Sequence, residues 1–381
     1  MKILQVHNYY QLRGGEATVV ETEKKLLEEN GHEVITYYRN NKEIAEYSLI
    51  KKVRLLKDTT WSDSSYNEVL NILKENKPDV CHVHNTLPII SPSVYAACKA
   101  QNVPIVQTLH NYRLICANGL FFRDGKVCED CLGKSAYNAV AKKCYRNSTL
   151  QTYTVARMVE KNKTNNIWSD LVDAYLCFTD FAKNKFVEHG LPKDKIFIKP
   201  NFVDFNLNAN HVKEDYLIYV GRLDENKGVR MFKKLSKSLK IPIKIVGEGD
   251  LKSELENLDN IELLGKQPYE KTINLIQKAK ALILPSFCYE GMPMTILEAF
   301  ASKTLVVASN LGAMQTMINH KQNGLLFKPK AVNELQNCID LALENHAETM
   351  VKNAYLDYKN KYSKTANYNA LMNIYTKITS K

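Results

Sequence analysis

Strand-like and helix-like segments alternate along this chain, and the alternation begins a second time after Asn201. Short apolar runs such as residues 2–7 and 103–111 are separated by amphipathic helical patterns such as residues 16–30. Buried strands that are separated by helices are typical of a parallel sheet covered on both faces. The second start therefore predicts two doubly wound α/β domains, each of which binds ligands beyond the carboxyl ends of its strands.

The chain length agrees with two domains. The chain has 381 residues, which exceeds the roughly 250–300 residues at which a single core stops growing. We assign residues 1–200 to the first domain and residues 201–363 to the second, with a polar, proline-containing junction near residues 199–210. The last helix, residues 364–381, carries apolar side chains at helical spacing and is expected to pack back on the first domain.

The charge of the chain restricts its partners. The formal net charge is +11, without a dense basic tail, and this fits anionic ligands or weak peripheral contact with an anionic membrane surface. The densest basic run, residues 51–57, also fits an ordinary solvated helix face. Basic residues interleaved with aromatic ones would indicate nucleic-acid binding, and no such stripe is present, so no nucleic-acid partner is expected.

The sequence shows no apolar run of the roughly 18 residues that a membrane span needs. Residues 1–10 also lack the apolar segment and the cleavage site of a signal peptide. We therefore expect a cytoplasmic protein that can lie peripherally at the inner face of the cytoplasmic membrane.

Two loops of the first domain follow strands and carry candidate functional groups. Gly14 and Gly15 come after the first strand and precede a helix, which suits a loop that approaches phosphate. Paired glycines also occur in ordinary tight turns. His110 follows the fourth strand, and the pattern leaves both a catalytic and a structural role open for it.

Three loops of the second domain follow strands in the same way. Arg222 and Lys227 share one loop and would suit a leaving diphosphate, although two surface bases give the same pattern. Gly247 follows the next strand, where a glycine lets a ligand come near the backbone. Glu290 precedes a glycine-proline turn and Glu298 lies in the helix after it. The start of such a helix can hold an anion, and the turn also fits a cap on a core helix.

These residues and their spacing resemble the retaining family 4 glycosyltransferases, which have the GT-B fold. That fold is α/β, with two facing Rossmann-like domains, parallel sheets and an inter-domain cleft. The resemblance covers nearly the whole chain and is strongest at "GRLDENKG" (residues 221–228) and "EGMPMTILEA" (residues 290–299), where Glu290 and Glu298 form the E-x7-E motif of the family. Residues 110–131 also look like a segment of a bacterial subset, many members of which build surface polysaccharides.

The resemblance implies a role for each candidate residue. Arg222 and Lys227 would bind the donor diphosphate and stabilise its charge as the glycosidic bond breaks. Glu298 would bind the nucleotide ribose. Glu290 and His110 would act at the donor sugar as the catalytic residues. The remaining donor-binding residues are glycines and backbone amides: Gly14, Gly15, Gly247, Gly291, Met292, Pro293, Met294 and Thr295.

The implied reaction is the transfer of a hexosyl unit from a UDP- or GDP-sugar with retention of configuration. The first domain would bind the acceptor, a glycan or a polyprenyl-diphosphate-linked sugar, and the second would bind the donor. The sequence has no evident Asp-x-Asp motif after a strand, and cationic side chains with helix N–H groups can stabilise the leaving diphosphate, so no metal is expected in catalysis. Gln315 and Thr316 stand where relatives often carry Pro-Glu, and the donor site is expected to differ slightly there.

Four of the nine cysteines lie in an insertion at about residues 112–150. Disulfides are not expected in a cytoplasmic protein. Cys128 and Cys131 have the spacing of half a structural zinc site, and Cys116 and Cys144 would complete four thiolate ligands. Four ordinary thiols are the alternative.

Two other functions remain open. A sugar-nucleotide epimerase has the same two-domain layout and would release nucleotide products without an acceptor. A non-catalytic protein could bind a nucleotide sugar as the partner of an active subunit. The four side chains expected at the donor favour the transferase over the non-catalytic protein, because a degenerate copy tends to lose them: Arg222, Lys227, Glu290 and Glu298.

Overall fold

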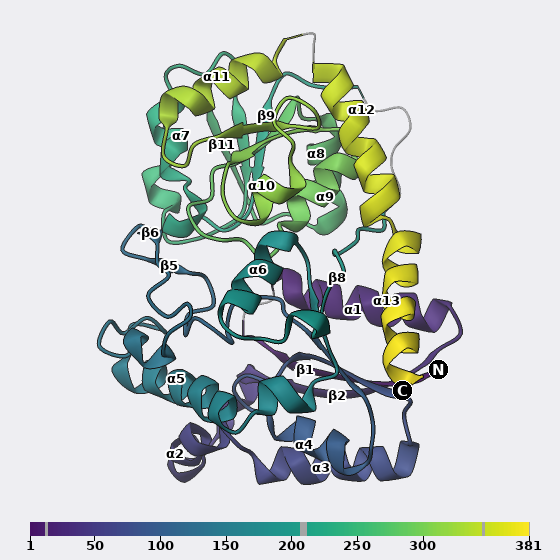
Figure 1. Ribbon diagram of the computed structural model, residues 1–381. Coiled ribbons are helices and arrows are strands. Elements are labelled where there is room, and N and C mark those ends of the chain that lie inside the picture. The colour runs from purple at the N-terminus through teal and green to yellow at the C-terminus, as the bar shows by residue number, and fades with distance from the viewer. Residues whose placement is uncertain (12–13, 206–211, 345–346, 381) are drawn as a thin grey trace. The chain divides into compact units, whose positions relative to one another are not determined.

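The computed structural model describes residues 1–11, 14–205, 212–344 and 347–380, and the chain divides into two compact units (Figure 1). Unit 1 comprises residues 1–121, 129–199 and 368–381, and unit 2 comprises residues 122–128 and 200–367. The division at Lys199 and Pro200 falls within the predicted junction, of which residues 206–210 lie outside the described residues.

Unit 1 is built on a six-stranded sheet in which all neighbouring strands are parallel. From edge to edge the strands are β2 (Glu33–Asn40), β1 (Lys2–Tyr9), β3 (Val80–Asn85), β4 (Ile105–Thr108), β7 (Ala174–Cys177) and β8 (Ile196–Ile198). The strand order reverses between β1 and β3, and open α/β sheets bind ligands at the carboxyl ends of the strands beside such a reversal.

Helices cover both faces of this sheet, as its fully buried strands require. The α-helices of unit 1 are α1 (Gly15–Glu29), α2 (Leu49–Asp58), α3 (Asp63–Asn76), α4 (Ser93–Ala100), α5 (Thr149–Thr164), α6 (Asp180–Glu188) and α13 (Lys364–Thr379). Figure 1 shows α1 and α13 on one side of the strands and α3 and α4 on the other.

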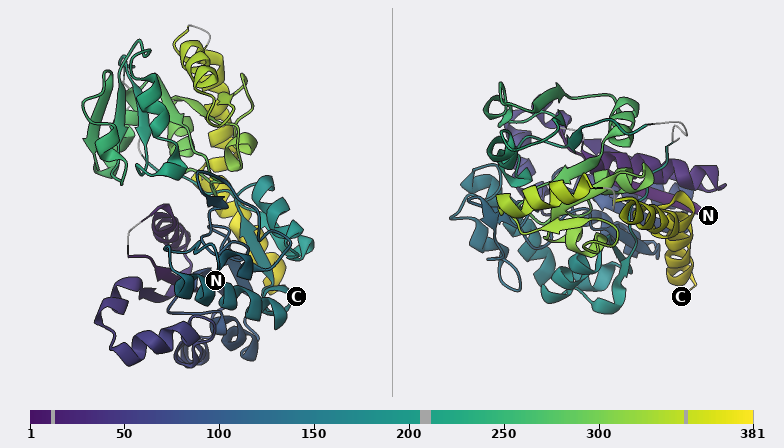
Figure 2. Two further views of the ribbon diagram at one scale, coloured as in Figure 1. Left: turned by 90° about the vertical axis from the view of Figure 1, so that its left-hand side faces the viewer. Right: turned by 90° about the horizontal axis from the view of Figure 1, so that it is seen from above.

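The last helix completes the core of unit 1. Leu371 and Tyr375 of α13 are fully buried against Ile3 of β1 and Leu27 of α1. The Tyr375 hydroxyl also forms a hydrogen bond with Nδ1 of His82 on β3, at 2.6 Å. Both ends of the chain therefore lie in unit 1, as Figure 2 shows.

Unit 2 repeats the architecture with a second six-stranded parallel sheet. Its strands, in spatial order, are β11 (Ile261–Gly265), β10 (Ile243–Val246), β9 (Leu217–Val220), β12 (Ala281–Leu284), β13 (Leu305–Ser309) and β14 (Leu325–Phe327). The order reverses between β9 and β12. The two parallel sheets confirm the predicted α/β fold class.

Two groups of helices pack on the sheet of unit 2. The helices are α7 (Arg230–Leu235), α8 (Tyr269–Lys278), α9 (Met294–Ala301), α10 (Ala313–Met317), α11 (Val332–Ala342) and α12 (Ala347–Asp357). α7 contacts α11, whereas α9 contacts both α8 and α12. Figure 1 shows these two groups on opposite sides of the strands.

A small antiparallel hairpin lies within the cysteine-containing insertion. It consists of β5 (Phe122–Arg123) and β6 (Lys126–Val127). The sequence placed the whole insertion in the first domain, whereas the hairpin belongs to unit 2. One physical reason is that Lys330 donates a hydrogen bond to the carbonyl oxygen of Gly125, at 2.5 Å.

The helices of the described residues are short. An α-helix needs about 20 residues to cross a bilayer, whereas α5 and α13 have 16 residues each. No helix in the described part of the chain combines the length and the apolar character that a membrane span requires.

Candidate functional site

Two loops meet at the carboxyl ends of the central strands of unit 2. One loop follows β9 and carries Arg222 and Lys227, and the other follows β12 and carries Glu290. The backbones are in direct contact, because a Cβ built on Gly228 would lie 1.9 Å from the carbonyl oxygen of Pro285. Gly228 also has a φ of +71°, which favours glycine. The strand reversal and this glycine therefore bring the two loops together.

An ion pair joins the two loops. The Lys227 ammonium donates to both carboxylate oxygens of Glu290, at 2.7 and 2.9 Å. The buried Ser286 hydroxyl donates to Oε1 of Glu290 at 2.8 Å, so that the carboxylate is held from two directions. The side chain of Glu290 is 15% exposed and that of Lys227 is 23% exposed. Both charges are thus partly withdrawn from water and still open on one side.

The environment keeps both groups ionised. Burial alone would raise the pKa of Glu290, but the charge of Lys227 and the hydrogen bonds from Lys227 and Ser286 outweigh it and lower this pKa. Burial would likewise lower the pKa of Lys227, and the charge of Glu290 raises it instead. The site therefore presents a fixed anion beside a fixed cation at neutral pH.

Arg222 lies at the exposed rim of the same loop. Its side chain is 61% exposed, and its Nη2 lies 2.9 Å from Oδ2 of Asp224. The Tyr219 hydroxyl donates to the carbonyl oxygen of Arg222 at 2.6 Å, which fixes the backbone at this position. The charge of Arg222 also contributes to the lowered pKa of Glu290. Two cations of one loop therefore act on the Glu290 carboxylate.

Helix α9 begins directly after the Glu290 loop. Met294 is its first residue, and Pro293 is the cap residue before it, with φ −65° and ψ 112°. The first N–H groups of a helix have no acceptor within the helix, so Met294 and Thr295 can donate to a ligand. The predicted binding backbone from Gly291 to Thr295 thus spans the turn and the first helical residues.

Glu298 lies inside α9 and is almost fully buried, with 7% of its surface exposed. Burial raises its pKa to about 7, although a hydrogen bond from Tyr269 of α8 opposes this effect. At neutral pH the carboxyl group therefore exchanges readily between its protonated and ionised forms. The sequence did not identify Tyr269, since an aromatic residue at the start of a helix carries no signal of this contact.

The structure gives a reason for a glycine at position 247 that the sequence did not suggest. A Cβ at this position would lie 1.8 Å from the carbonyl oxygen of Gly221, and φ is +148°. The glycine therefore lets the loop after β10 pack against the loop after β9. This close contact is one reason for the glycine, and its part in donor binding stays a prediction.

In unit 1, His110 follows β4 and contacts a second histidine. Its Nε2 lies 3.0 Å from Nδ1 of His84 on β3. Burial lowers the pKa of His110 well below its usual value, and the neighbouring histidines lower it further. His110 is therefore neutral at physiological pH and can exchange hydrogen bonds but carries no charge.

A buried charged cluster lies behind His110, and the sequence did not reveal it. Glu23 of α1 contacts the ammonium of Lys199 at 2.6 Å, His82 at 3.1 Å and His84 at 3.3 Å. The ligand atoms of Glu23, His82 and His84 lie within 4.8 Å of one another, as in a metal site. Lys199 already supplies the positive charge, so the cluster is explained without a metal ion. Glu23 lies in an ordinary amphipathic helical pattern, so the sequence did not indicate that it is buried or charge-paired.

Gly14 borders a hollow of unit 1. Gly15 is the first residue of α1, and Gly14 is its cap. Among the described residues, no heavy atom lies within 4 Å of a Cβ built on Gly14. Gly14 lines a hollow of about 300 Å³ together with Tyr9, Asn40 and Lys42. The side of Gly14 is therefore open, and donor binding by the two glycines stays a prediction.

The four predicted zinc ligands stay a prediction. A tetrahedral zinc site places its sulfur atoms about 3.8 Å apart. Among the described residues, no three of the four thiols lie within 4.8 Å of one another. Cys116, Cys131 and Cys144 belong to unit 1, whereas Cys128 lies in the segment that belongs to unit 2.

Comparison with known protein families gives two matches that together span most of the chain. The model described as "Glycosyltransferase Family 4" matches residues 13–207, and the model described as "Glycosyl transferases group 1" matches residues 203–357. A putative teichuronic acid biosynthesis glycosyltransferase, TuaC of Bacillus subtilis, is 23% identical over 378 residues and is similar over 89% of this chain and 88% of its own.

A shorter match carries a more specific name. An α-1,4-N-acetyl-D-galactosaminyltransferase of Campylobacter jejuni, whose name specifies a diphosphate-undecaprenol-linked glycan, is 30% identical over 185 residues. The match covers 44% of this chain and 51% of that protein. Among solved structures, HepE of Anabaena in complex with UDP superposes with a TM-score of 0.66 at 14% identity, covering 98% of this chain and 99% of its own. This likeness shows that the two proteins share a fold, which is GT-B.

Proposed function

Because the chain belongs to glycosyltransferase family 4, we propose that it transfers a hexosyl unit from a UDP- or GDP-sugar with retention of anomeric configuration. The observation that carries this proposal is the ion pair between Lys227 and Glu290 at the strand reversal of unit 2. A cation and an anion fixed side by side suit a donor that is anionic at its diphosphate and rich in hydroxyl groups at its sugar.

In this proposal, Lys227 and Arg222 bind the donor diphosphate. Its negative charge grows as the glycosidic bond breaks, and fixed cations stabilise that charge. The first N–H groups of α9 act on the same phosphates. No step of this scheme depends on a metal ion.

Glu290 accepts hydrogen bonds from hydroxyl groups of the donor sugar. Its lowered pKa keeps it ionised, so that it serves as an acceptor rather than as an acid. Glu298 accepts hydrogen bonds from the ribose, and ribose binding favours its ionised form. In unit 1, the donor-binding role of Gly15 and the role of His110 at the donor sugar stay predictions.

The acceptor is proposed to be a glycan or a sugar linked to a polyprenyl diphosphate. The names of the two relatives support this, since one refers to teichuronic acid biosynthesis and the other to an undecaprenol-linked glycan. The hollow beside Gly14 is lined by Tyr9, Asn40 and Lys42, and an aromatic ring with polar side chains suits a sugar. An acceptor of this kind would place the protein at the cytoplasmic face of the membrane.

A thermal-shift panel with UDP, GDP, ADP and their sugar conjugates tests the donor. A ligand at 100 times its dissociation constant stabilises the folded state by about 2.7 kcal/mol, which raises the Tm by a few degrees. We expect one nucleotide class to do so, with or without magnesium. The anomeric proton of the transferred sugar, observed by NMR, then reports retention.

Two results would contradict the proposal. One is the absence of any nucleotide shift together with the absence of sugar transfer, which would leave a non-catalytic protein. The other is release of nucleotide at an unchanged rate without any acceptor, which would indicate an epimerase.

A further inference from the structure

Helix α2 of unit 1 exposes large apolar side chains. Leu49 is 81% exposed, Ile50 is 82% exposed and Val53 is 67% exposed. No residue of α2 is buried. Isolated exposed apolar residues are common on protein surfaces, but three within one helical turn form a patch.

Basic side chains surround this patch. The four cations of the helix are Lys51, Lys52, Arg54 and Lys57, and its one acidic residue is Asp58. Residues four apart are neighbours on a helix surface, so Arg54 lies next to Ile50 and Lys57 lies next to Val53. The exposed face of α2 is therefore both apolar and strongly positive.

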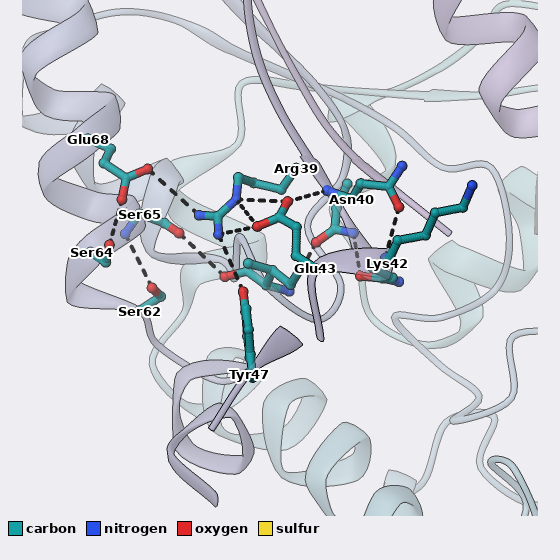
Figure 3. A network of polar contacts seen from close by, with 12 residues as sticks. Arg39, Asn40, Lys42, Glu43, Tyr47, Ser62, Ser64, Ser65 and Glu68 are labelled. Carbon is teal, nitrogen blue, oxygen red and sulfur yellow. Dashed lines mark hydrogen bonds and ion pairs between the residues drawn. The ribbon is translucent and has the colours of Figure 1, made fainter. Parts of the chain in front are cut away.

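A polar network fixes the segment that leads into α2 (Figure 3). Arg39 at the end of β2 donates to Glu43 at 2.6 Å and to the Tyr47 hydroxyl at 3.4 Å. Arg39 also lies 3.8 Å from Glu68 of α3. The ammonium of Lys51 lies 3.8 Å from the centre of the Tyr47 ring, which ties the first turn of α2 to this network. The exposed face is thus presented by an anchored helix.

An apolar hollow adjoins the same helix. It has a volume of about 290 Å³ and lies between α2 and α5. Leu55, Leu56 and Val155 are among its lining residues, and Lys52 and Arg146 line it as well. An apolar hollow beside two cations suits the hydrocarbon chain of a lipid whose headgroup carries a phosphate.

We propose that α2 docks on a membrane surface that contains anionic phospholipids. Leu49, Ile50 and Val53 enter the boundary between headgroups and acyl chains, and the surrounding cations pair with lipid phosphates. This inference rests on the proposed function only in that a membrane-borne acceptor gives the docking its purpose. A second copy of the chain does not suit this exposed face of α2, because a two-fold contact would bring the cations of the two α2 helices together.

Vesicle flotation of the full-length protein tests the docking. We expect co-flotation with vesicles of phosphatidylglycerol and phosphatidylethanolamine, less binding at high salt, and little binding to phosphatidylcholine alone. The variant Lys52→Glu with Lys57→Glu should bind at least about thirtyfold more weakly, because each lysine near an anionic surface contributes a factor of about five. Ile50→Ser with Val53→Ser should lose binding to a similar extent.

Matched variants in unit 2 serve as controls. Lys233→Glu with Lys237→Glu changes the charge equally on exposed lysines, and Val212→Ser removes an apolar side chain that is 78% exposed. Both should float like the unaltered protein. Equal flotation of the α2 variants and the unaltered protein would overturn the proposal. So would a dimer in solution that dissociates on Ile50→Ser with Val53→Ser, because the face would then be a protein interface.

The nucleotide thermal shift on the same samples separates the two proposals. A preserved shift without any flotation overturns the docking and leaves the donor site standing. Flotation that depends on α2 without any nucleotide shift supports the docking and contradicts the proposed donor.

Discussion

Lys227 donates to both carboxylate oxygens of Glu290, at 2.7 and 2.9 Å, and thereby joins the loops that follow two adjacent strands of unit 2. The residues are 63 positions apart in the sequence. The contact exists because β9 and β12 are neighbours at the reversal of strand order and because Gly228 lets the loops approach. Lys227 and Glu290 hold each other in position before a donor binds. Donor binding therefore does not have to order these two side chains.

The first prediction concerns this pair. Lys227→Met removes the cation paired with Glu290 and leaves this largely buried carboxylate with the hydrogen bond from Ser286 and the charge of Arg222. Loss of one fixed group that stabilises charge in the transition state typically costs about 3–4 kcal/mol, so kcat should fall by about two to three orders of magnitude. Steady-state kinetics with the donor identified by thermal shift measures this change.

Glu290→Gln should lower kcat to a similar extent, because the amide cannot accept at both atoms. The variants should retain a folded structure by circular dichroism. Near-normal turnover in both would remove the pair from the reaction.

The second prediction uses two arginines of similar exposure. The side chain of Arg222 is 61% exposed and that of Arg230 is 45% exposed, and each is paired with a carboxylate. Arg222→Ala should raise KM for the donor and lower kcat, since its charge acts at the Glu290 site. Arg230→Ala removes an equivalent surface ion pair, worth about 1 kcal/mol or less, and should change kcat/KM less than twofold. Equal effects of the two substitutions would contradict the assignment of Arg222.

The third prediction follows from the raised pKa of Glu298. Burial raises it to about 7 in the folded protein, against 4.5 for an ordinary glutamate. The folded state then holds a proton that the unfolded state has lost, so stability falls as the pH rises from about 4.5 to 7. The free energy of unfolding is about 3 kcal/mol lower once the pH is above 7.

Glu298→Gln should therefore raise the Tm of the protein at pH 8 and leave it nearly unchanged at pH 4. Nucleotide binding to the ionised form should release protons near pH 7, which calorimetry in buffers of different ionisation enthalpy detects. The release from Glu298 should disappear in the variant, whereas protons lost by the nucleotide phosphates should not. A Tm difference that is independent of pH would show that Glu298 titrates normally.

The sequence predicted the features that depend on local pattern. Alternating apolar strands and amphipathic helices predicted both parallel sheets. An apolar strand has to be covered on both faces, and an amphipathic helix can cover it with its apolar side. Loops after strands β9 and β12 could be placed together, since the carboxyl ends of parallel strands share one edge. The family resemblance identified Glu290 and Glu298 as members of one motif. Their spacing alone would not have identified them.

Contacts between distant segments escaped the sequence. Lys199 meets Glu23 across 176 positions, and neither residue stands in a motif. The predicted zinc site also depends on contacts between separate segments, and it stays a prediction. The spacing of Cys128 and Cys131 suggested ligands, and the structure assigns Cys128 to unit 2 and Cys131 to unit 1. The packing role of Gly247 escaped the sequence as well, and its part in donor binding stays a prediction.

The last prediction concerns the ion pair between Glu23 and Lys199, whose side chains are 1% and 2% exposed. Lys199→Met leaves Glu23 as a buried carboxylate without its counter-charge, and breaking a buried pair in this way costs about 3–5 kcal/mol. Chemical denaturation should show this loss of unfolding free energy. Adding Glu23→Gln should recover part of the loss, because no unpaired charge then remains. Lys24→Met, which breaks the exposed pair with Glu28, should cost only about 0.5 kcal/mol. If Lys199→Met cost no more than Lys24→Met, the buried pair would contribute nothing to the stability of unit 1.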